Sequence, residues 1–149
     1  MKRPGLKLFV LALASLAGCA GTAPVLGVKD GRLTPCPSTP NCVSSQAQAT
    51  DPEHCIDPLA VPGSPEEAMQ KLLDVVAKRS DAKIVSEEKG YLRAEFHTLM
   101  GFVDDVEFLY APDVKGFHVR SASRLGKGDF GVNRKRVESL RAALTAAGR

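Results

Sequence analysis

Apolar residues recur at helical spacing in two segments of the chain. In the first segment Ser64 can cap a helix, Pro65 suits the first helical position, and Glu67 completes a capping box. The spacing that follows predicts a helix that ends between residues 79 and 81. A second helix is predicted over residues 133–147, with three apolar side chains on one face: Val137, Leu140 and Leu144.

Between the two predicted helices, apolar and polar residues alternate in four segments, which indicates β-strands joined by hairpins. These strands are predicted over residues 83–88, 91–99, 102–110 and 116–123. The order of elements predicts an α+β fold: a two-layer domain of helix, four-stranded antiparallel sheet and helix, in which both helices cover one face of the sheet. Alternation assigns seven apolar residues to the covered face: Leu92, Ala94, Phe96, Val106, Phe108, Phe117 and Val119.

The same alternation places charged residues and histidines on the opposite face of the predicted sheet. The hairpin register that we expect sets Asp105 beside Arg120 and Glu107 beside His118. This face is interpreted as a solvated surface with cross-strand ion pairs; the alternative is a surface that binds a polar ligand or a metal ion, although the residues are too scattered to favour a metal. Its residues are Arg93, Glu95, His97, Asp105, Glu107, His118 and Arg120.

Residues 1–18 have the layout of a bacterial lipoprotein signal peptide. Three positive charges precede an apolar run, residues 8–17, that is too short to span a membrane. The run ends in Leu-Ala-Gly-Cys, which resembles a lipobox, so Cys19 is expected to be acylated and to become the mature N-terminus. The alternatives are an ordinary secretory signal and an uncleaved anchor, and both would still export the domain.

The residues after Cys19 indicate where the acylated protein goes. Ala20 and Gly21 follow it, with no Asp, which by resemblance to Gram-negative sorting rules favours the outer membrane, with the domain facing the periplasm. We therefore expect a protein of the bacterial cell envelope that binds the membrane through acylated Cys19. Residues 19–32 lack an amphipathic period and are interpreted as the acylated residue and a flexible tether, followed by one globular domain over residues 33–149.

Charge argues against a nucleic-acid partner. The formal net charge of the 149-residue chain is +3, but the excess positive charges, Lys2, Arg3 and Lys7, lie in the predicted signal peptide. The mature protein is formally neutral and lacks the attraction that dominates binding to nucleic acid. A G-x-G-x-x-G pattern at residues 126–131 is not a dinucleotide site, because no βαβ unit accompanies it and the chain ends before the acidic residue that such a site needs. No cofactor is therefore expected.

Three cysteines remain in the exported domain, where disulfides persist. Cys36 and Cys42 bracket a Pro-rich loop that can turn back far enough for disulfide geometry, so we expect this pair, with Cys55 left unpaired. A metal site built from the three cysteines and His54 is the alternative, but the spacing matches no zinc-site pattern. No metal ion is therefore expected.

Basic residues gather between the last predicted strand and the last helix, in residues 120–136. At a helix N-terminus such cations oppose the helix dipole unless an anion lies there. The anion is either a carboxylate of the chain, in an internal network, or a small ligand such as a phosphate, a carboxylate or a sugar acid. We favour the network, because short basic runs are often only solvated. Its members would be Asp104, Asp105, Asp129, Arg120, Arg124 and Arg134.

Three stretches of the chain resemble the domain of unknown function 1499 family: residues 35–45 (PCPSTPNCVSS), 101–108 (GFVDDVEF), and 119–124 with 131–138 (VRSASR, GVNRKRVE). Many members of that family look like envelope lipoproteins or membrane-attached proteins, which agrees with the lipobox. The family name states no activity, so the resemblance supplies no catalytic residue. It implies that a site lies among the matching residues, and Cys55 is outside them. They are Cys36, Asn41, Cys42, Ser44, Ser45, Asp104, Asp105, Glu107, Arg120, Ser121, Ser123, Arg124, Asn133 and Arg134.

The sequence contains no nucleophile beside a residue that would activate it. We therefore expect a non-enzymatic binding or interaction module of the cell envelope, whose partner is an envelope protein or a small anionic ligand. A purely structural role is one alternative. The other is an enzyme or small-anion binding protein, and its chemistry would use the cluster of Asp104, Asp105 and Glu107 with Arg120, Arg124 and Arg134.

Overall fold

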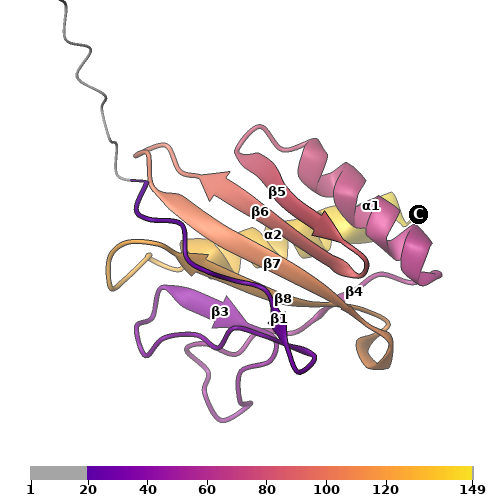
Figure 1. Cartoon of the computed structure of the whole chain (residues 1–149), viewed down its shortest axis with the longest axis horizontal. Helices are drawn as coiled ribbons and strands as arrows, with labels where there is room; N and C mark the ends of the chain where they lie inside the picture. The colour runs from indigo at the N-terminus through magenta and orange to yellow at the C-terminus, as the bar shows by residue number, and fades with distance from the viewer. Residues whose placement is uncertain (1–19, 149) are drawn as a thin grey trace, which may run out of the picture.

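A computed structural model describes residues 20–148 of the chain (Figure 1). The helices are α1 (Pro65–Ala77), α2 (Val132–Ala147) and the 3-10 helix η1 (Pro112–Val114). The strands are β1 (Val28–Lys29), β2 (Arg32–Leu33), β3 (Cys42–Ser44), β4 (Leu59–Ala60), β5 (Ala82–Glu88), β6 (Tyr91–His97), β7 (Val103–Ala111) and β8 (Gly116–Ser123). No helix in residues 20–148 combines the length and the apolar character needed to cross a membrane. The predicted signal peptide and Cys19 lie outside the described residues.

Helix α1 begins with the predicted capping box. The Glu67 amide donates to Ser64 Oγ at 3.2 Å, and the Ser64 amide donates to the Glu67 carboxylate at 2.8 Å. The helix ends at Ala77, slightly before the predicted limit, and Arg79 pairs with Asp81 in the turn that follows. Both helices are therefore formed where the periodicity predicts them, with small differences at their ends.

The sheet is antiparallel and has more strands than predicted. Its order is β3-β8-β7-β6-β5, and β4 also pairs with β8. The four predicted strands correspond to β5, β6, β7 and β8, so the prediction of a four-stranded sheet is wrong by two short strands. Strands β3 and β4 are only two or three residues long, and both pair with a strand more than 50 residues away in the sequence. Segments this short have too few residues for an alternating pattern to predict them.

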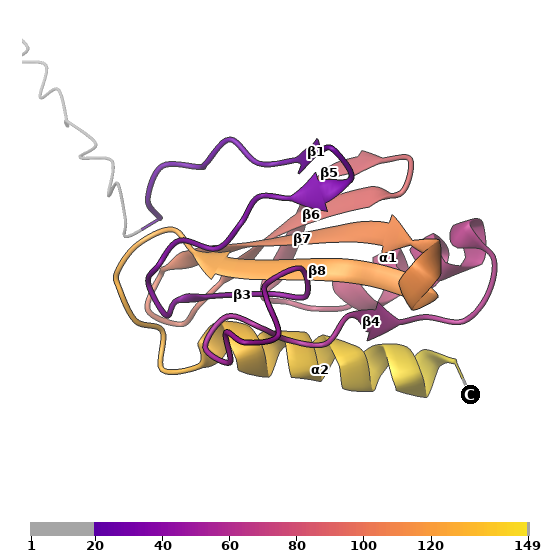
Figure 2. The ribbon, with the colours of Figure 1, turned by 90° about the horizontal axis from the view of Figure 1, so that it is seen from below.

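Both helices pack on one face of the sheet, as expected, and Figure 2 shows α2 lying along that face. The core contains all seven sheet residues that alternation assigned to the covered face. Helix α1 contributes Ala68, Leu72, Val75 and Val76, and α2 contributes Val137, Leu140 and Leu144.

The register of the β7–β8 hairpin differs from the expected one by two residues. Glu107 lies opposite Arg120, and His118 lies opposite Leu109, so the predicted neighbours Asp105/Arg120 and Glu107/His118 are wrong. The cause is the turn: Pro112 begins η1, which makes Ala111 and Gly116 the closing pair. Gly116 is required there, because a Cβ at this position would lie 2.0 Å from the carbonyl oxygen of Leu59 in β4.

The face of the sheet opposite the helices is covered in part by the N-terminal segment, residues 20–33. This segment contains the hairpin β1–β2, and Figure 2 shows it on the side of the sheet away from α2. Leu33 is buried, and the Gly27 amide donates to the Glu107 carboxylate at 3.0 Å. Part of the segment interpreted as a flexible tether therefore contacts the domain, and the polar face is less open to solvent than alternation alone indicated.

Candidate functional site

Most of the polar residues predicted as a site fall into two clusters on opposite faces of β7 and β8. One cluster lies under the N-terminal segment, and we call it the hairpin-side cluster. The other lies between the sheet and α2, and we call it the helix-side cluster. The hairpin-side cluster consists of Tyr91, Arg93, Glu95, Asp105, Glu107, Arg120 and Arg124. The helix-side cluster consists of Asn41, Asp104, Ser121, Ser123, Asp129, Asn133 and Arg136.

Arg124 and Asp105 form the centre of the hairpin-side cluster. Arg124 donates from Nε and Nη2 to the two oxygens of Asp105 at 2.7 and 2.9 Å, and it also bonds Glu95. Arg93 donates to the same Asp105 carboxylate at 2.7 Å. Burial alone would raise the pKa of Asp105, but the hydrogen bonds and charges of Arg124 and Arg93 outweigh it and hold that pKa below its ordinary value. This aspartate is a stable anion inside the fold.

Glu107 and Arg120 lie beside this centre and are less well satisfied. Glu107 is fully buried; one carboxylate oxygen accepts from the Tyr91 hydroxyl at 2.9 Å and from the Gly27 amide at 3.0 Å. Arg120 Nη1 lies 3.5 Å from the other oxygen, and Arg120 Nε is buried without a hydrogen-bond partner. Burial raises the pKa of Glu107 more than its neighbours lower it. Among the predicted site residues, this buried ion pair has the least complete hydrogen bonding.

The helix-side cluster ties α2 to β3, β7 and β8. Asn133 accepts from Ser121 Oγ at 2.6 Å and from Arg136 at 2.7 Å, and its amide group donates to the Asn41 carbonyl oxygen at 3.1 Å. Arg136 also pairs with Asp104. Sequence reasoning placed Arg136 in the basic run but did not include it among the site residues; its i,i+3 spacing from Asn133 was the available signal.

The anion expected at the N-terminus of α2 is a side chain of the chain itself. Asp129 accepts hydrogen bonds from the Gly131 and Asn133 amides at 2.8 and 2.9 Å. Arg134 donates to the carbonyl oxygens of Pro52 and Glu53, both at 3.1 Å. The internal network that we favoured is present in part, because its members are split between two faces of the sheet. Arg124 pairs with Asp105 as expected, whereas the other two arginines have partners other than Asp104 and Asp129.

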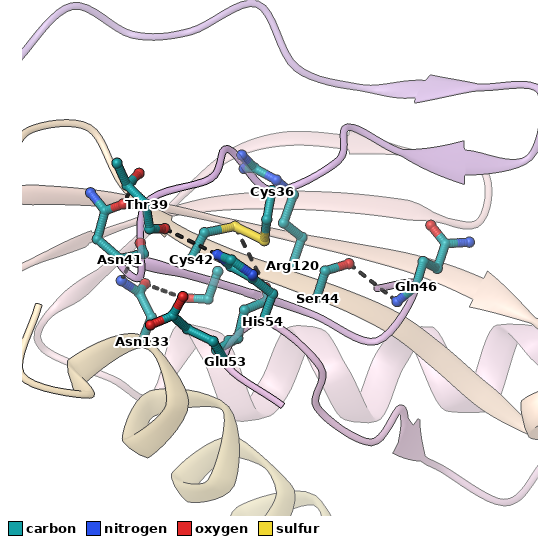
Figure 3. Close-up of a disulfide and its surroundings, with 12 residues drawn as sticks. Cys36, Thr39, Asn41, Cys42, Ser44, Gln46, Glu53, His54, Arg120 and Asn133 are labelled. Carbon is teal, nitrogen blue, oxygen red and sulfur yellow. Dashed lines mark hydrogen bonds between the residues drawn. A yellow bond between two sulfur atoms is a disulfide. The ribbon is translucent and has the colours of Figure 1, made fainter. Parts of the chain in front are cut away.

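The disulfide between Cys36 and Cys42 is formed as predicted, with Cα atoms 5.7 Å apart (Figure 3). Cys55 is the unpaired cysteine within residues 20–148. His54 forms a hydrogen bond with the disulfide loop. Its Nδ1 lies 2.7 Å from the Asp51 carboxylate and its Nε2 lies 3.2 Å from the Thr39 carbonyl oxygen. The hydrogen bond to Asp51 raises the pKa of His54 above its ordinary value. No signal in the sequence identified this role.

A groove of about 700 Å³ runs beside the disulfide loop. One wall is the loop itself, and the other walls are β2 and residues 46–54. Its lining is mixed in charge and contains exposed prolines: Arg32, Leu33, Pro35, Cys36, Pro37, Ser38, Ser44, Gln46, Ala47, Gln48, Asp51, Glu53 and His54. It is the concave surface that the predicted disulfide motif builds directly.

The two motif serines after the disulfide are held by backbone groups. The Gln46 amide donates to Ser44 Oγ at 3.2 Å, and the Val119 amide donates to Ser45 Oγ at 2.9 Å. Ser45 Oγ also lies 3.1 Å from His118 Nδ1, a serine–histidine contact that sequence reasoning missed, since 73 residues separate the two. Burial lowers the pKa of His118. Within residues 20–148 no carboxylate pairs with His118, so the contact lacks the third member of a catalytic triad.

The model of the DUF1499 family, described as a protein of unknown function, matches residues 32–144. The chain belongs to the DUF1499 family. The DUF1499 match begins at Arg32 in β2 and ends in α2, so it includes both clusters and the disulfide groove. No solved structure and no curated protein matches the chain. Within residues 20–148, no group of three or more His, Cys, Asp or Glu side chains is arranged to hold a metal ion.

Proposed function

We propose that this DUF1499 protein is an envelope lipoprotein, anchored through acylated Cys19, whose domain binds a protein partner in the groove beside the disulfide loop. The proposed binding site rests on a difference in solvent exposure between two groups of motif residues. The motif residues Asp105, Glu107 and Arg124 are buried in ion pairs, whereas the loop from Cys36 forms the wall of an open groove. The lipobox supports the anchor, and the disulfide agrees with an exported domain.

The charges that line the groove favour a protein segment over a small anion. Arg32 is the lining arginine, and its guanidinium donates to the Gln46 carbonyl oxygen at 2.9 Å. Asp51 and Glu53 line the same groove and would repel an anion. Exposed prolines and polar side chains can instead contact an extended polypeptide over its length.

Two of the three arginines that suggested a small anionic ligand already have partners within the chain. Arg124 binds Asp105 and Glu95, and Arg134 binds two carbonyl oxygens. The enzymatic alternative would need access to Glu107, which lies beneath Gly27 and Tyr91 and is fully buried. These contacts favour a binding module over acid, base or ion-pair catalysis.

Site-specific photocrosslinking in intact cells tests the proposal. A photoreactive amino acid replaces Ser38 or Gln48, which are exposed in the groove, and Lys78, exposed after α1, is the matched control. We expect both groove positions to capture the same protein and the control position not to capture it. Introducing Glu53→Lys in the groove should reduce the yield, whereas Glu138→Lys on the exposed part of α2 should not.

Two outcomes would contradict the proposal in different ways. If mass spectrometry of the exported protein shows no acyl chains on Cys19, the anchor is wrong. If the protein is acylated and folded but neither groove position captures a partner, the binding site is wrong and a structural role is favoured.

A further inference from the structure

Exposed apolar side chains gather at one end of the sheet. Five of the eight large apolar residues exposed in residues 20–148 lie in two neighbouring segments, so their placement is not scattered. These segments are the β6–β7 turn and the loop from β8 into α2, which meet because Asp104 at the start of β7 pairs with Ser123 at the end of β8. We call this surface the apolar end. Its residues are Leu99, Met100, Leu125, Phe130 and Val132.

The β6–β7 turn does not need apolar residues to form. The Gly101 amide donates to the Thr98 carbonyl oxygen at 2.9 Å, and the Phe102 amide donates to Thr98 Oγ1 at 3.0 Å. Gly101 supplies the positive φ of 81°. Leu99 and Met100 occupy the exposed tip, where turns ordinarily carry Gly, Asn, Asp or Ser. Their side chains therefore gain no burial within the domain.

Phe130, in the neighbouring loop, is also an exposed apolar residue. Its side chain is 98% exposed, and its backbone has a φ of 53°, a conformation that bulky residues rarely adopt. The loop is held by Asp129, whose carboxylate accepts from the Gly131 amide at 2.8 Å. The fold gains no burial from Phe130 and holds it outward.

The chain enters the domain at this same end. Figure 1 shows the first described residues beside the β6–β7 turn, and Figure 2 shows them beside the loop from β8 into α2. Gly21 packs so closely on that loop that a Cβ there would lie 3.0 Å from atoms of Arg124 and Leu125. Ala20 directly follows Cys19 in the sequence. A lipid on Cys19 would thus be attached within a few residues of the apolar end.

We infer that the apolar end docks on the bilayer surface, with Leu99, Met100 and Phe130 inserted among the lipids beside the acyl chains. The inference rests on the proposed acylation of Cys19, because the acyl chains bring the bilayer to this end of the domain. Insertion removes exposed apolar surface from water and adds to the anchoring of the acyl chains.

Charge at the apolar end agrees with a lipid surface. The turn from Thr98 to Phe102 has no charged residue, so its insertion desolvates no charge. Lys127 is exposed in the neighbouring loop and can meet anionic headgroups, whereas the Asp129 carboxylate is bonded to backbone amides. A protein occupant would have to fit between the domain and its own anchor, which disfavours it.

Fluorescence quenching on the reconstituted full-length mature protein tests the inference. The chain contains no tryptophan, so Phe130→Trp introduces a single fluorophore at the apolar end. Lys89→Trp places one in the exposed β5–β6 turn at the opposite end of the sheet and is the control. The acylated variants are placed in vesicles of phosphatidylethanolamine and phosphatidylglycerol, with or without phosphatidylcholine that carries bromine near the top of its acyl chains.

We expect bromine to remove about half of the emission of the Phe130→Trp variant and little of that of the Lys89→Trp variant, because only the first lies at the depth of the upper acyl chains. Adding Leu99→Ser and Met100→Ser should reduce the quenching while the protein stays on the vesicles. An acylated, vesicle-bound protein whose Phe130→Trp emission is not quenched would overturn the docking and leave the anchor standing. A blue-shifted emission that bromine does not quench would assign the apolar end to a second protein copy. If Cys19 carries no lipid, both the anchor and the docking are wrong.

Discussion

Arg124 and Arg134 belong to the same motif, but the fold uses them differently. The Arg124 side chain is 6% exposed and neutralises Asp105 and Glu95, whereas Arg134 bonds only to two carbonyl oxygens near the surface. Removing one partner of a buried ion pair leaves a charge without compensation. The importance of each motif arginine for folding therefore follows its burial and not its position in the motif.

We predict that Arg124→Ala lowers the free energy of unfolding by about 3 kcal/mol. Arg134→Ala should lower it by less than about 1 kcal/mol. Urea denaturation of the two variants, followed by circular dichroism, measures both values. Equal and small losses would show that Arg93 alone can satisfy Asp105.

His54 makes the stability of the disulfide loop depend on pH. Both ring nitrogens face oxygen acceptors, the Asp51 carboxylate and the Thr39 carbonyl, so the imidazolium satisfies both contacts and the neutral ring only one. The pKa of His54 is raised in the folded protein, first by the hydrogen bond to Asp51. A raised pKa contributes stability that is fully present below the unfolded pKa and is lost as the pH rises through the folded value.

The free energy of unfolding should therefore fall as the pH rises above about 6.5, the ordinary histidine value, and through the higher folded pKa of His54. His54→Gln should flatten this part of the profile, whereas His97→Gln, on an exposed side chain, should preserve it. Urea denaturation at a series of pH values gives the comparison. The explanation is wrong if both variants keep the slope of the unchanged protein.

At the residue scale, the sequence predicted which polar residues share a face of the sheet, but not which of them form ion pairs with one another. Alternation placed Arg93, Glu95, Asp105, Glu107 and Arg120 on one face correctly. The ion pairs depend on side-chain reach and on a register set by η1, neither of which the alternation contains. His54 and its partners come from two loops, and loops carry no periodic signal.

The disulfide loop is the element on which the proposed groove depends. Cys42 begins β3, which pairs with the far strand β8, so the disulfide fastens the loop from Cys36 to the edge of the sheet. By closing a short loop, such a link removes conformations from the unfolded chain. The same bond thereby stabilises the fold and shapes the groove wall.

Replacing both cysteines, Cys36→Ala with Cys42→Ala, should lower the free energy of unfolding by about 2 kcal/mol, as expected for a link across six residues. Added reductant should destabilise the unchanged protein by a similar amount and have no effect on the double variant. Cys55→Ser is the control, because Cys55 takes no part in the disulfide. A double variant as stable as the unchanged protein would contradict this role.

Elements with a long periodic pattern were predictable, and elements made by distant pairing were not. Helices α1 and α2 and strands β5 to β8 follow the period of their own residues. Strands β3 and β4 exist because β8 is long enough to pair with both at different ends, and β1–β2 is fixed by a buried Leu33. Such contacts join segments that are far apart in the sequence, so local patterns do not encode them.

At the scale of the whole molecule, residues 20–33 cover part of the polar face of the sheet. The Gly27 amide and the Tyr91 hydroxyl share one oxygen of Glu107, which lies beneath the segment. The family match begins only at Arg32, so most of this cover lies outside the matched residues. The matched domain alone would have a more exposed Glu107 and Arg120.

A protein that begins at residue 32 tests this cover. Because burial is the main cause of the raised pKa of Glu107, exposure should move that pKa down, towards its ordinary value. A pH titration of the Glu107 carboxyl by nuclear magnetic resonance, in the shortened and the complete mature protein, measures the difference. Equal values in the two proteins would show that the segment does not shield the carboxylate.

Asp104 and Asp105 are consecutive in β7, and they point to opposite faces, one to Arg136 and the other to Arg124. If β7 slipped by one residue against its neighbours, the two carboxylates would exchange faces, and each would lose its arginine. A misaligned sheet would then carry several unpaired charges in its interior, at a cost comparable to the whole stability of a small domain. The acidic pair thus makes a one-residue slip of β7 unfavourable and selects the native register of the sheet.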